Sequence, residues 1–513
     1  MGIVVLVPAI DRESVIAARS WNILGRELAR SGHAVVRFSL RGDGDSSDLP
    51  DADVLAAWQQ DVRSAIDLAE ALLPGVAVTL VGLRVGASLA AAIEDPRIGH
   101  RLLWEPVSGR RYLRAQQALR SITVAEPTVD DAVELAGESY TAEQAASIGR
   151  LKAPGDGANI RRETDREVAA RLHACITRDA RVPRGAIAEI CASLPRVRPR
   201  ALERWAPKAI ATHPVASGAV REHRVVVGPH QLPGIFTEGS QAQGTRAVLF
   251  CAAGSEPMDG PTGLWTRTAR DLALVGVSSL RVDRRGVGEV LDETQDQEPN
   301  PYRVTCAEDL AEGIGHLRSM GFDDINTMGL SSAGWSFCHA AAIEPPDRIV
   351  MINNVGWHRD ESRYRNIFQQ TRLERLLGSG IPTGDEVTAA PPSAWKRTLR
   401  GALKTFRDGT MARLPRPLWV LLSRMGIVMD PEPLLCLVPP GTRLTLLLGE
   451  ADQPKWEGVH GPRCAARLGA RGYRIEVLTC PEMDHSLLSR RGRLAMRRWA
   501  TEAFGQGQSP SGG

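Results

Sequence analysis

The chain carries the same order of predicted elements twice, and this internal repeat constrains its fold more than any other feature. Each half opens with alternating segments: strand, helix, strand, helix, strand. In the first half these segments are residues 3–8, 17–31, 34–40, 55–73 and 77–81. In the second half they are residues 247–251, 265–276, 278–282, 307–320 and 325–328.

Two landmarks show that the spacing inside the repeat is kept. Gly42 in the first half corresponds to Gly286 at an offset of 244 residues, and Arg84 corresponds to Ser331 at an offset of 247. Strands that alternate with helices of about 10 to 15 residues predict βαβ units and a mainly parallel sheet. We therefore expect each half to form its own doubly wound α/β domain.

The length of the chain also favours two domains, because 513 residues exceed what one hydrophobic core usually organises. A cluster of turn-forming residues interrupts the pattern between the halves, so the predicted domains are 1–215 and 216–504. Residues 224–227 and 234–237 are expected to form the opening hairpin of the second domain. The polar tail 505–513 is expected to be disordered.

Charge and apolar patterning exclude several classes of protein. The net charge is only +3 and basic residues are scattered among acidic ones, so no nucleic-acid partner is expected; the Arg-rich run 196–204 is interpreted as a solvated linker or helix approach. No apolar run approaches the roughly 18 residues of a membrane-spanning helix, and the first residues lack the basic region of a signal peptide.

The cysteines also bear on metal binding and on the cellular compartment. The 8 cysteines contain no Cys-x-x-Cys pair, and no Cys/His spacing suits zinc. Without a secretion signal they are expected to be free thiols in a reducing compartment. We therefore expect a cytoplasmic protein that needs no metal and no cofactor.

Residues 329–333 read Gly-Leu-Ser-Ser-Ala and lie between a predicted strand and a predicted helix at 335–343. A serine hydroxyl is a weak nucleophile that needs a base within hydrogen-bond reach. In the nucleophile elbow of α/β-hydrolases the serine stands on a strained strand-to-helix turn between small residues. We predict that Ser331 is the nucleophile. A structural serine in a tight turn is the alternative, and Ser332 is the candidate if the register differs by one.

The same fold orders its catalytic triad as serine, acid and histidine along the chain. The closing elements of the second half are predicted at 349–353, 444–448, 459–472 and 474–479. Asp452 is favoured as the triad acid over Glu450, which would lie nearer the strand and point elsewhere. His485 follows the last strand, where a general base would have to lie. Its neighbour Asp484 is interpreted as a loop-capping acid and remains an alternative partner.

The oxyanion hole is expected to use the backbone N–H of Ser332 and a second N–H from the loop 251–255, with Ala253 at its centre. Residues 355–440 are rich in helix formers and are predicted to form a helical cap over the site. The aromatic residues of this cap would line an acyl or substrate pocket, or only pack the cap on its base: Trp357, Trp395, Phe406 and Trp419.

The equivalent elbow in the first half, residues 82–86, carries Arg84. A guanidinium group is permanently charged and cannot act as a nucleophile. A helix at 166–175 and a strand near Arg181 fit the closing segments of a second core, but no histidine follows them before His213. The first domain is therefore expected to be catalytically inactive. Arg84 would either pack structurally or hold an anion at the start of the next helix.

Further motifs accompany the two elbows. Residues 103–107 read Leu-Trp-Glu-Pro-Val after the elbow 82–86, Gly260-Pro261 precedes the second elbow, and residues 484–486 read Asp-His-Ser. With these motifs, the two halves together resemble α/β-hydrolase-fold proteins of bacterial polysaccharide and exosortase-associated gene clusters. The resemblance covers most of the chain.

The resemblance implies a serine hydrolase that cleaves an ester or thioester, or an acyltransferase of the same fold. Either enzyme would act on a small-molecule or carrier-bound acyl substrate. Glu289 replaces the usual Asp after Gly-x-Gly, which is expected to alter a loop, and Ala333 replaces the elbow Gly. A non-catalytic scaffold or carrier-binding protein is the remaining alternative, and the set of Ser331, Asp452 and His485 argues against it.

Overall fold

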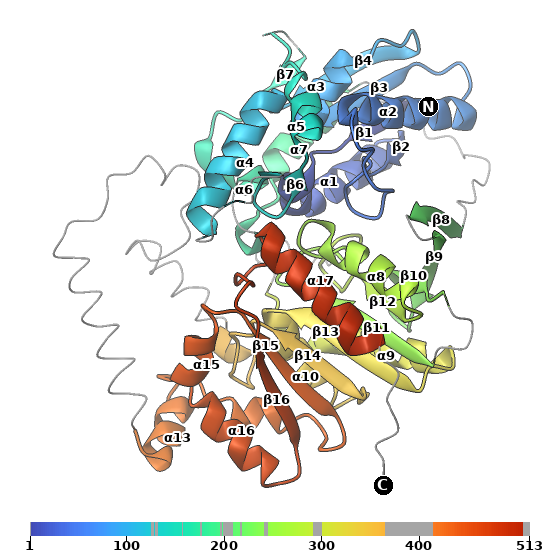
Figure 1. Cartoon of the computed structure of the whole chain (residues 1–513). Coiled ribbons are helices and arrows are strands. Elements are labelled where there is room, and N and C mark those ends of the chain that lie inside the picture. Colours follow the sequence, from blue (N-terminus) through green and yellow to red (C-terminus); the bar gives the residue numbers. More distant parts are fainter. Residues whose placement is uncertain are drawn as a thin grey trace, which may run out of the picture.

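Each half of the chain forms its own β-sheet, and the two sheets lie one above the other in Figure 1. The structure is a computed structural model. It describes residues 2–124, 128, 132–155, 157, 159–174, 177–194, 197, 209–215, 218–240, 245–290, 300–364 and 414–505.

The first sheet has five strands in the order β2-β1-β3-β4-β7, all parallel. Its strands are β1 (Ile3–Val7), β2 (Ala34–Arg37), β3 (Val78–Leu83), β4 (Ile98–Trp104) and β7 (Ile160–Arg161). Its helices are α1 (Asp11–Arg30), α2 (Val54–Leu72), α3 (Val85–Ala92), α4 (Gly109–Thr123), α5 (Ala142–Gly149), α6 (Arg166–His173), the 3-10 turn η1 (Thr177–Asp179) and α7 (Arg184–Ser193). A separate ribbon pairs β5 (Val133–Glu134) with β6 (Ser139–Tyr140).

The second sheet has nine strands in the order β16-β15-β14-β13-β11-β12-β10-β9-β8. They are β8 (Ile210–Val215), β9 (Gly218–Val227), β10 (Leu232–Glu238), β11 (Arg246–Cys251), β12 (Ser278–Val282), β13 (Asp324–Leu330), β14 (Arg348–Ile352), β15 (Arg443–Leu448) and β16 (Arg474–Thr479). The helical elements are η2 (Pro261–Gly263), α8 (Leu264–Leu274), α9 (Val304–Ser319), α10 (Ser332–Ala340), α13 (Arg416–Arg424), α14 (Glu432–Leu435), α15 (Gln453–Gly458), α16 (Gly461–Gly469) and α17 (Arg490–Gly505).

The repeat in the sequence is a repeat of topology. The order β2-β1-β3-β4-β7 of the first sheet recurs as β12-β11-β13-β14-β15 inside the second, where these strands are also parallel. The second sheet adds β16 at one edge and the antiparallel strands β8, β9 and β10 at the other. From β9 to β16 its order is that of the α/β-hydrolase fold. The predicted fold class of tandem, mainly parallel α/β-hydrolase-type sheets is thus confirmed.

Both faces of the second sheet are covered, which explains why its strands read as continuous apolar runs. Along β11, Leu249 faces a core shared with α9 and α10, whereas Val248 and Phe250 face a core shared with α8 and α17. The first sheet is built alike, with α2 to α5 on one face and α1, α6 and α7 on the other. Among the described helices, none combines the length and the apolar character needed to cross a bilayer.

Three expectations differ from the structure. Strand β8 pairs with β9, so the expected boundary at 215 falls inside a hairpin of the second sheet, which begins at Ile210. The strand expected near Arg181 is a connection between η1 and α7, because the first sheet already ends at the short strand β7. The helix expected over 459–472 is the shorter α16 (Gly461–Gly469), which begins after the left-handed residue His460 (φ 59°), and a separate helix, α15, precedes it.

Two other expectations lie partly or wholly outside the described residues. Of the cap 355–440, residues 365–413 are outside them, and the described part holds α13 and α14. The tail beyond α17 is also outside them.

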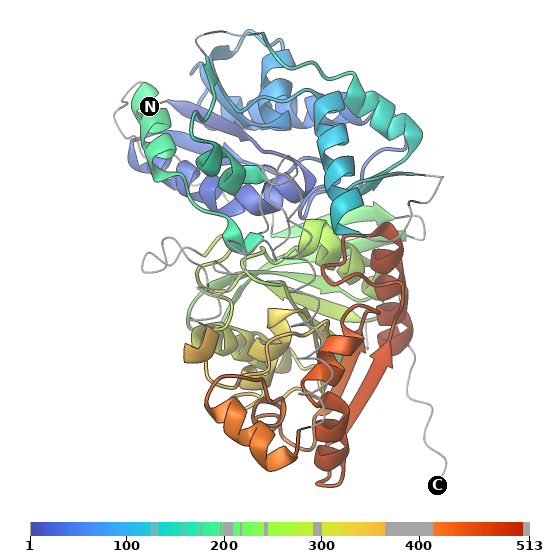
Figure 2. The same ribbon diagram turned by 90° about the vertical axis from the view of Figure 1, so that its left-hand side faces the viewer.

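We call the half of the chain with the five-stranded sheet the first copy and the half with the nine-stranded sheet the second copy. Loops that follow strands of the two sheets meet where the two copies are in contact. Helix α1, which follows β1, packs against η2, which follows β11. Ser255 Oγ donates to the carbonyl of Thr177 at 2.9 Å, and Gly137 N donates to the carbonyl of Leu488 at 2.9 Å. Figure 2 shows the same contact of the two copies from the side.

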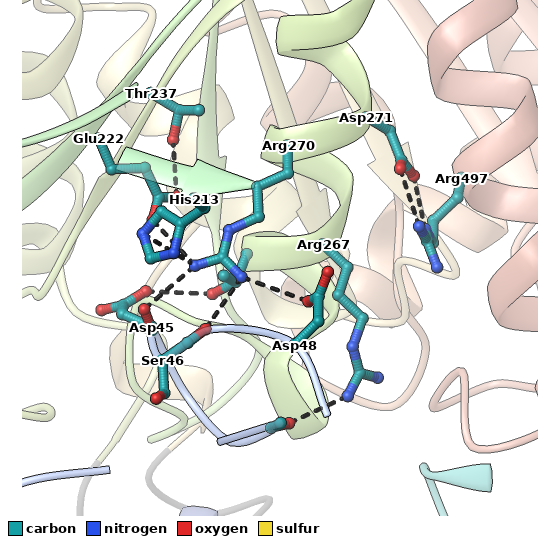
Figure 3. Close-up of polar contacts among 12 residues, drawn as sticks. Asp45, Ser46, Asp48, His213, Glu222, Thr237, Arg267, Arg270, Asp271 and Arg497 are labelled. Carbon is teal, nitrogen blue, oxygen red and sulfur yellow. Dashed lines mark hydrogen bonds and ion pairs between the residues drawn. The ribbon is translucent and has the colours of Figure 1, made fainter. Parts of the chain in front are cut away.

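A buried ion network also joins the copies (Figure 3). Arg281 lies in β12, and its guanidinium donates to Glu222 of β9 at 2.8 Å and to Asp45 of the first copy. Arg270 of α8 donates to the same Glu222 at 2.9 Å and to the carbonyl of Ser46 at 2.9 Å. Because Arg281 is fully buried and Glu222 nearly so, each charge depends on its partners, and the network fixes how the copies pack.

Candidate active site

Ser331 occupies a strained turn between β13 and α10. Its backbone dihedrals are φ 53° and ψ −114°, a left-handed conformation that costs about 1–3 kcal/mol in a residue with a side chain. The turn needs a glycine at 329, since a Cβ there would lie 2.5 Å from the Cβ of Ala333. The alanine in place of the usual second glycine therefore fits because its partner position has no side chain.

Asp452 and His485 follow β15 and β16 and are brought together. His485 Nδ1 and Asp452 Oδ1 are 2.8 Å apart, and the Asp452 side chain is almost completely buried. Burial alone would raise the pKa of Asp452, but the hydrogen bond from His485 and the ammonium of Lys455, 2.7 Å away, outweigh it and lower this pKa. A carboxylate held ionised on Nδ1 leaves His485 Nε2 as the basic nitrogen.

The two alternative acids lie in other environments. Glu450 is exposed. The carboxylate of Asp484 accepts backbone N–H groups from Ser486, Leu488 and Ser489 at 2.9 to 3.2 Å, which is a loop-capping arrangement.

Asn353 links the loops of this site and was missed in the sequence. Its Nδ2 donates to the carbonyls of Asp484 and His485 at 3.0 and 3.1 Å, and its Oδ1 accepts from Gly449 N at 2.7 Å. The preceding residue, Ile352, accepts from Ser331 N at 2.7 Å. The buried amide at the end of β14 therefore positions the loops of the acid and the histidine, and the backbone carbonyl before it holds the elbow. Its φ of 47° suits asparagine, but no local sequence pattern reveals its long-range contacts.

The hydroxyl of Ser331 makes no hydrogen bond to any residue within the described ranges, and neither does His485 Nε2. Catalytic hydrogen bonds are often long in a structure without substrate and tighten only when the substrate is bound. Ser332 differs, because its Oγ accepts from Gly254 N at 3.0 Å and its side chain is buried.

The loop expected to complete the oxyanion hole is held beside the elbow. The bond from Gly254 N to Ser332 Oγ joins this loop to the start of α10. Buried Arg284 donates to the carbonyls of Ala252 and Gly254 at 3.1 and 3.0 Å, so these carbonyls are occupied on both sides of Ala253. These bonds hold the backbone on both sides of Ala253 in place, and an N–H group of an oxyanion hole must be held in place before the reaction.

Two aromatic residues of the expected cap lie within the described residues, and both pack against the base. The Trp357 ring lies 4.8 Å from that of Trp456, and the Trp419 ring stacks on His460 at 4.0 Å. Trp395 and Phe406 lie outside the described residues.

The first copy keeps the elbow geometry without a nucleophile. Arg84 has φ 57° and ψ −118°, nearly the values of Ser331. Its guanidinium donates twice to the carboxylate of Glu13, at 3.0 and 3.1 Å, and both side chains are largely buried. The anion at this elbow is thus a side chain of the same copy.

A cavity of about 80 Å³ lies beside the histidine loop, between the copies. Arg12, Val15, Thr123 and Thr177 line it from the first copy, and Glu256, Pro261, Thr262, Ser486 and Leu488 from the second. The first copy therefore forms part of the wall next to His485.

Strand order and the strained elbow together define the class, an α/β-hydrolase-type fold. No family model and no curated protein matches the chain. Solved structures that it resembles include dienelactone hydrolase from Anabaena variabilis, at 13% identity over 57% of this chain and 97% of that one, with a TM-score of 0.32.

Two further likenesses are of the same kind. An α/β serine hydrolase without a lid from Xanthomonas campestris shows 14% identity over 58% of this chain and 95% of that one, with a TM-score of 0.29. Acetyl xylan esterase 1 from Thermoanaerobacterium sp. shows 16% identity over 58% and 89%, with a TM-score of 0.32.

Proposed function

We propose that the protein is a serine hydrolase that cleaves an ester or thioester through an acyl-Ser331 intermediate. The observation that carries this proposal is that one sheet holds the strained elbow of Ser331 after β13 and the hydrogen-bonded pair of Asp452 and His485 after β15 and β16. The amide of Asn353, which bonds both the acid loop and the histidine loop, adds support.

In this mechanism His485 Nε2 takes the proton of Ser331 Oγ as the oxygen attacks the carbonyl carbon of the substrate. Asp452 keeps Nδ1 protonated and stabilises the imidazolium that forms. The N–H groups of Ser332 and Ala253 would bind the developing oxyanion. The tetrahedral intermediate expels an alcohol or thiol, which receives the proton from His485, and water then releases the acid by the reverse sequence.

Acyl transfer is the second candidate, and one observation favours it. The first copy covers the loops of Ser255 and Leu488, which flank the proposed oxyanion loop and the histidine. A covered site can admit an acceptor other than water to the acyl-enzyme. Adding glycerol to an ester assay would then yield glyceryl ester in excess over free acid, whereas free acid alone would leave hydrolysis as the reaction.

Fluorophosphonate labelling of the full chain tests the nucleophile. We expect wild type to label at one site and Ser331→Ala not at all. Loss of the base in His485→Ala should slow labelling by about 10²–10⁴-fold. Ser332→Ala tests the register and should label more slowly, since it releases Gly254 N, while Ser336→Ala in the same helix should label like wild type.

Two results would contradict the assignment. Labelling of Ser331→Ala at the wild-type rate would move the nucleophile elsewhere. A wild-type protein that binds no probe although it is folded would favour the non-catalytic scaffold.

A further inference from the structure

A second cavity, of about 230 Å³, lies between the copies and is separate from the proposed nucleophile. It is walled by α1, by the loop after β2, by residues 257–259 after β11 and by the loop after β12. Its volume lies below the roughly 300 Å³ at which pockets begin to hold drug-sized ligands, so it suits a small molecule.

Three buried carboxylates line this cavity. The relative exposures of Asp43, Asp259 and Asp283 are 7%, 8% and 2%. Within the described residues none of the three forms an ion pair, whereas the neighbouring carboxylates of Asp45 and Glu289 pair with Arg281 and Arg37. The site is therefore short of positive charge.

Asp259 shows the deficit most clearly. Its carboxylate lines the cavity, is more than nine-tenths buried, and has no hydrogen-bond donor among the described residues. Buried polar groups in native proteins are nearly always satisfied, so the carboxylate of Asp259 indicates a ligand that donates hydrogen bonds to it.

The pKa values of the three carboxyl groups are all raised, as expected where carboxylates lie close together without enough positive charge. Burial and the charge of Asp11 raise the pKa of Asp43 to about 8, and burial raises the pKa of Asp283 to about 7. Burial raises the pKa of Asp259 well above its usual value, and its acidic neighbours add to the rise. The charged groups that face the three carboxylates or share their cavity are Asp11, Asp45, Glu138, Glu289, Arg37, Arg267 and Arg281.

We propose that this cavity binds a small organic cation with an ammonium or guanidinium group. Three carboxylates from different loops can accept its N–H donors, and the rings of Trp21 and Phe38 line the same cavity. Aromatic faces attract organic cations through their quadrupole, so this wall suits an alkylamine. The site takes residues from both copies, and it gives the first copy a role that needs no nucleophile.

Isothermal titration calorimetry on the full chain tests the proposal, with putrescine and agmatine as probes. Butanediol of the same length as putrescine is the neutral control. We expect both amines to bind at one site, the diol not to bind, and Asp259→Asn to weaken amine binding about tenfold or more. The matched variant Asp323→Asn removes the same charge from an exposed position and should change affinity less than about twofold.

Asp259→Asn replaces a buried carboxyl group that has no ion-pair partner by an amide of the same shape, so the variant should fold, and its melting temperature should stay unchanged or rise. Equal binding of putrescine and the diol overturns the proposal, and so does amine binding that is unchanged in Asp259→Asn. Binding of magnesium or calcium chloride in place of both amines, lost in Asp259→Asn, would make the cavity a metal site instead. Absence of heat from every probe overturns it as well. Amine binding is measured without any reaction at Ser331, so this test can fail or succeed whatever the result of fluorophosphonate labelling.

Discussion

At the scale of single residues, the two copies place left-handed backbone at the same point of the sheet. Asn353 follows β14 with φ 47°, and Glu105 follows β4, the equivalent strand, with φ 50°. Their side chains differ in what they reach. Asn353 contacts the acid and histidine loops, whereas Glu105 Oε1 accepts from the backbone N of Glu163. The difference lies in the side chain, since the backbone is alike.

Asn353→Gly should separate positioning from folding. Glycine tolerates the positive φ, so the variant loses only the three hydrogen bonds of the amide. We expect the rate of fluorophosphonate labelling to fall about 10²-fold, because small displacements of a catalytic group have effects of this size. Glu105→Gly makes the same backbone change in the first copy and should label like wild type. Equal rates for the two variants would show that Asn353 has no positioning role.

At the scale of elements, the ion pair of Arg84 and Glu13 holds the first elbow to α1. Glu13 lies in the first turn of this helix and Arg84 directly precedes α3. The contact spans 71 residues of sequence, so it couples the two elements instead of stabilising either alone. Removing one partner of a buried pair leaves the other charge without compensation.

Arg84→Met should therefore lower the free energy of unfolding by about 3–5 kcal/mol. The double variant Arg84→Met with Glu13→Gln should recover most of this loss, because no buried charge remains. Denaturant unfolding of both single variants and the double variant gives the coupling energy. If the double variant is as unstable as the sum of the single ones, the pair is not coupled.

Helices and strands were predicted well from the sequence where the spacing of apolar residues and the length of the segment indicate the same type of element. The strands Ser278–Val282 and Arg474–Thr479 begin and end at the predicted residues, and the tandem α/β arrangement is confirmed. The prediction at Arg181 failed because it assumed a closing strand in the first copy, and none of the described residues after β7 joins the first sheet. The boundary was misplaced because β8 has little apolar pattern and gains its place by pairing with β9.

The site could be predicted only in part, for a physical reason. The elbow is a local feature, so the sequence around Ser331 carries it. The catalytic roles of Ser331, Asp452 and His485 stay a prediction. The contacts of Asn353 span 131 and 132 residues of sequence, and the partner of Arg84 lies on another helix. Such contacts depend on tertiary placement, which no short motif encodes.

At the scale of the whole molecule, the contact between the copies contains a titratable group near the proposed site. Glu256 Oε1 accepts from Thr177 of the first copy at 3.4 Å, while its Oε2 is buried without a partner. Burial raises the pKa of Glu256 to about 7, and the charge of Arg12 and the bond from Thr177 offset only part of the rise. The folded protein thus keeps a proton here that the unfolded chain releases near pH 4.5.

Stability should therefore fall as the pH rises through this window. Between about pH 4.5 and 7 the folded state binds more protons at Glu256 than the unfolded state, so the free energy of unfolding decreases with pH. We expect Glu256→Gln to remove about 2–3 kcal/mol of this decrease, measured by denaturant unfolding at pH 5 and pH 8. Glu450→Gln is the exposed control and should leave the pH dependence unchanged. Identical slopes for wild type and Glu256→Gln would show that the carboxyl titrates normally.

The edges of the two sheets, as the described residues form them, have a consequence for aggregation. An edge strand exposes unpaired backbone groups to which another chain can add. The first sheet ends in β7, whose two residues offer almost no template. The second sheet ends in β16, six residues long, with Val477 40% exposed. Arg474 and Glu476 interrupt the apolar character of that edge, so replacing both by apolar residues would turn β16 into the place where self-association begins.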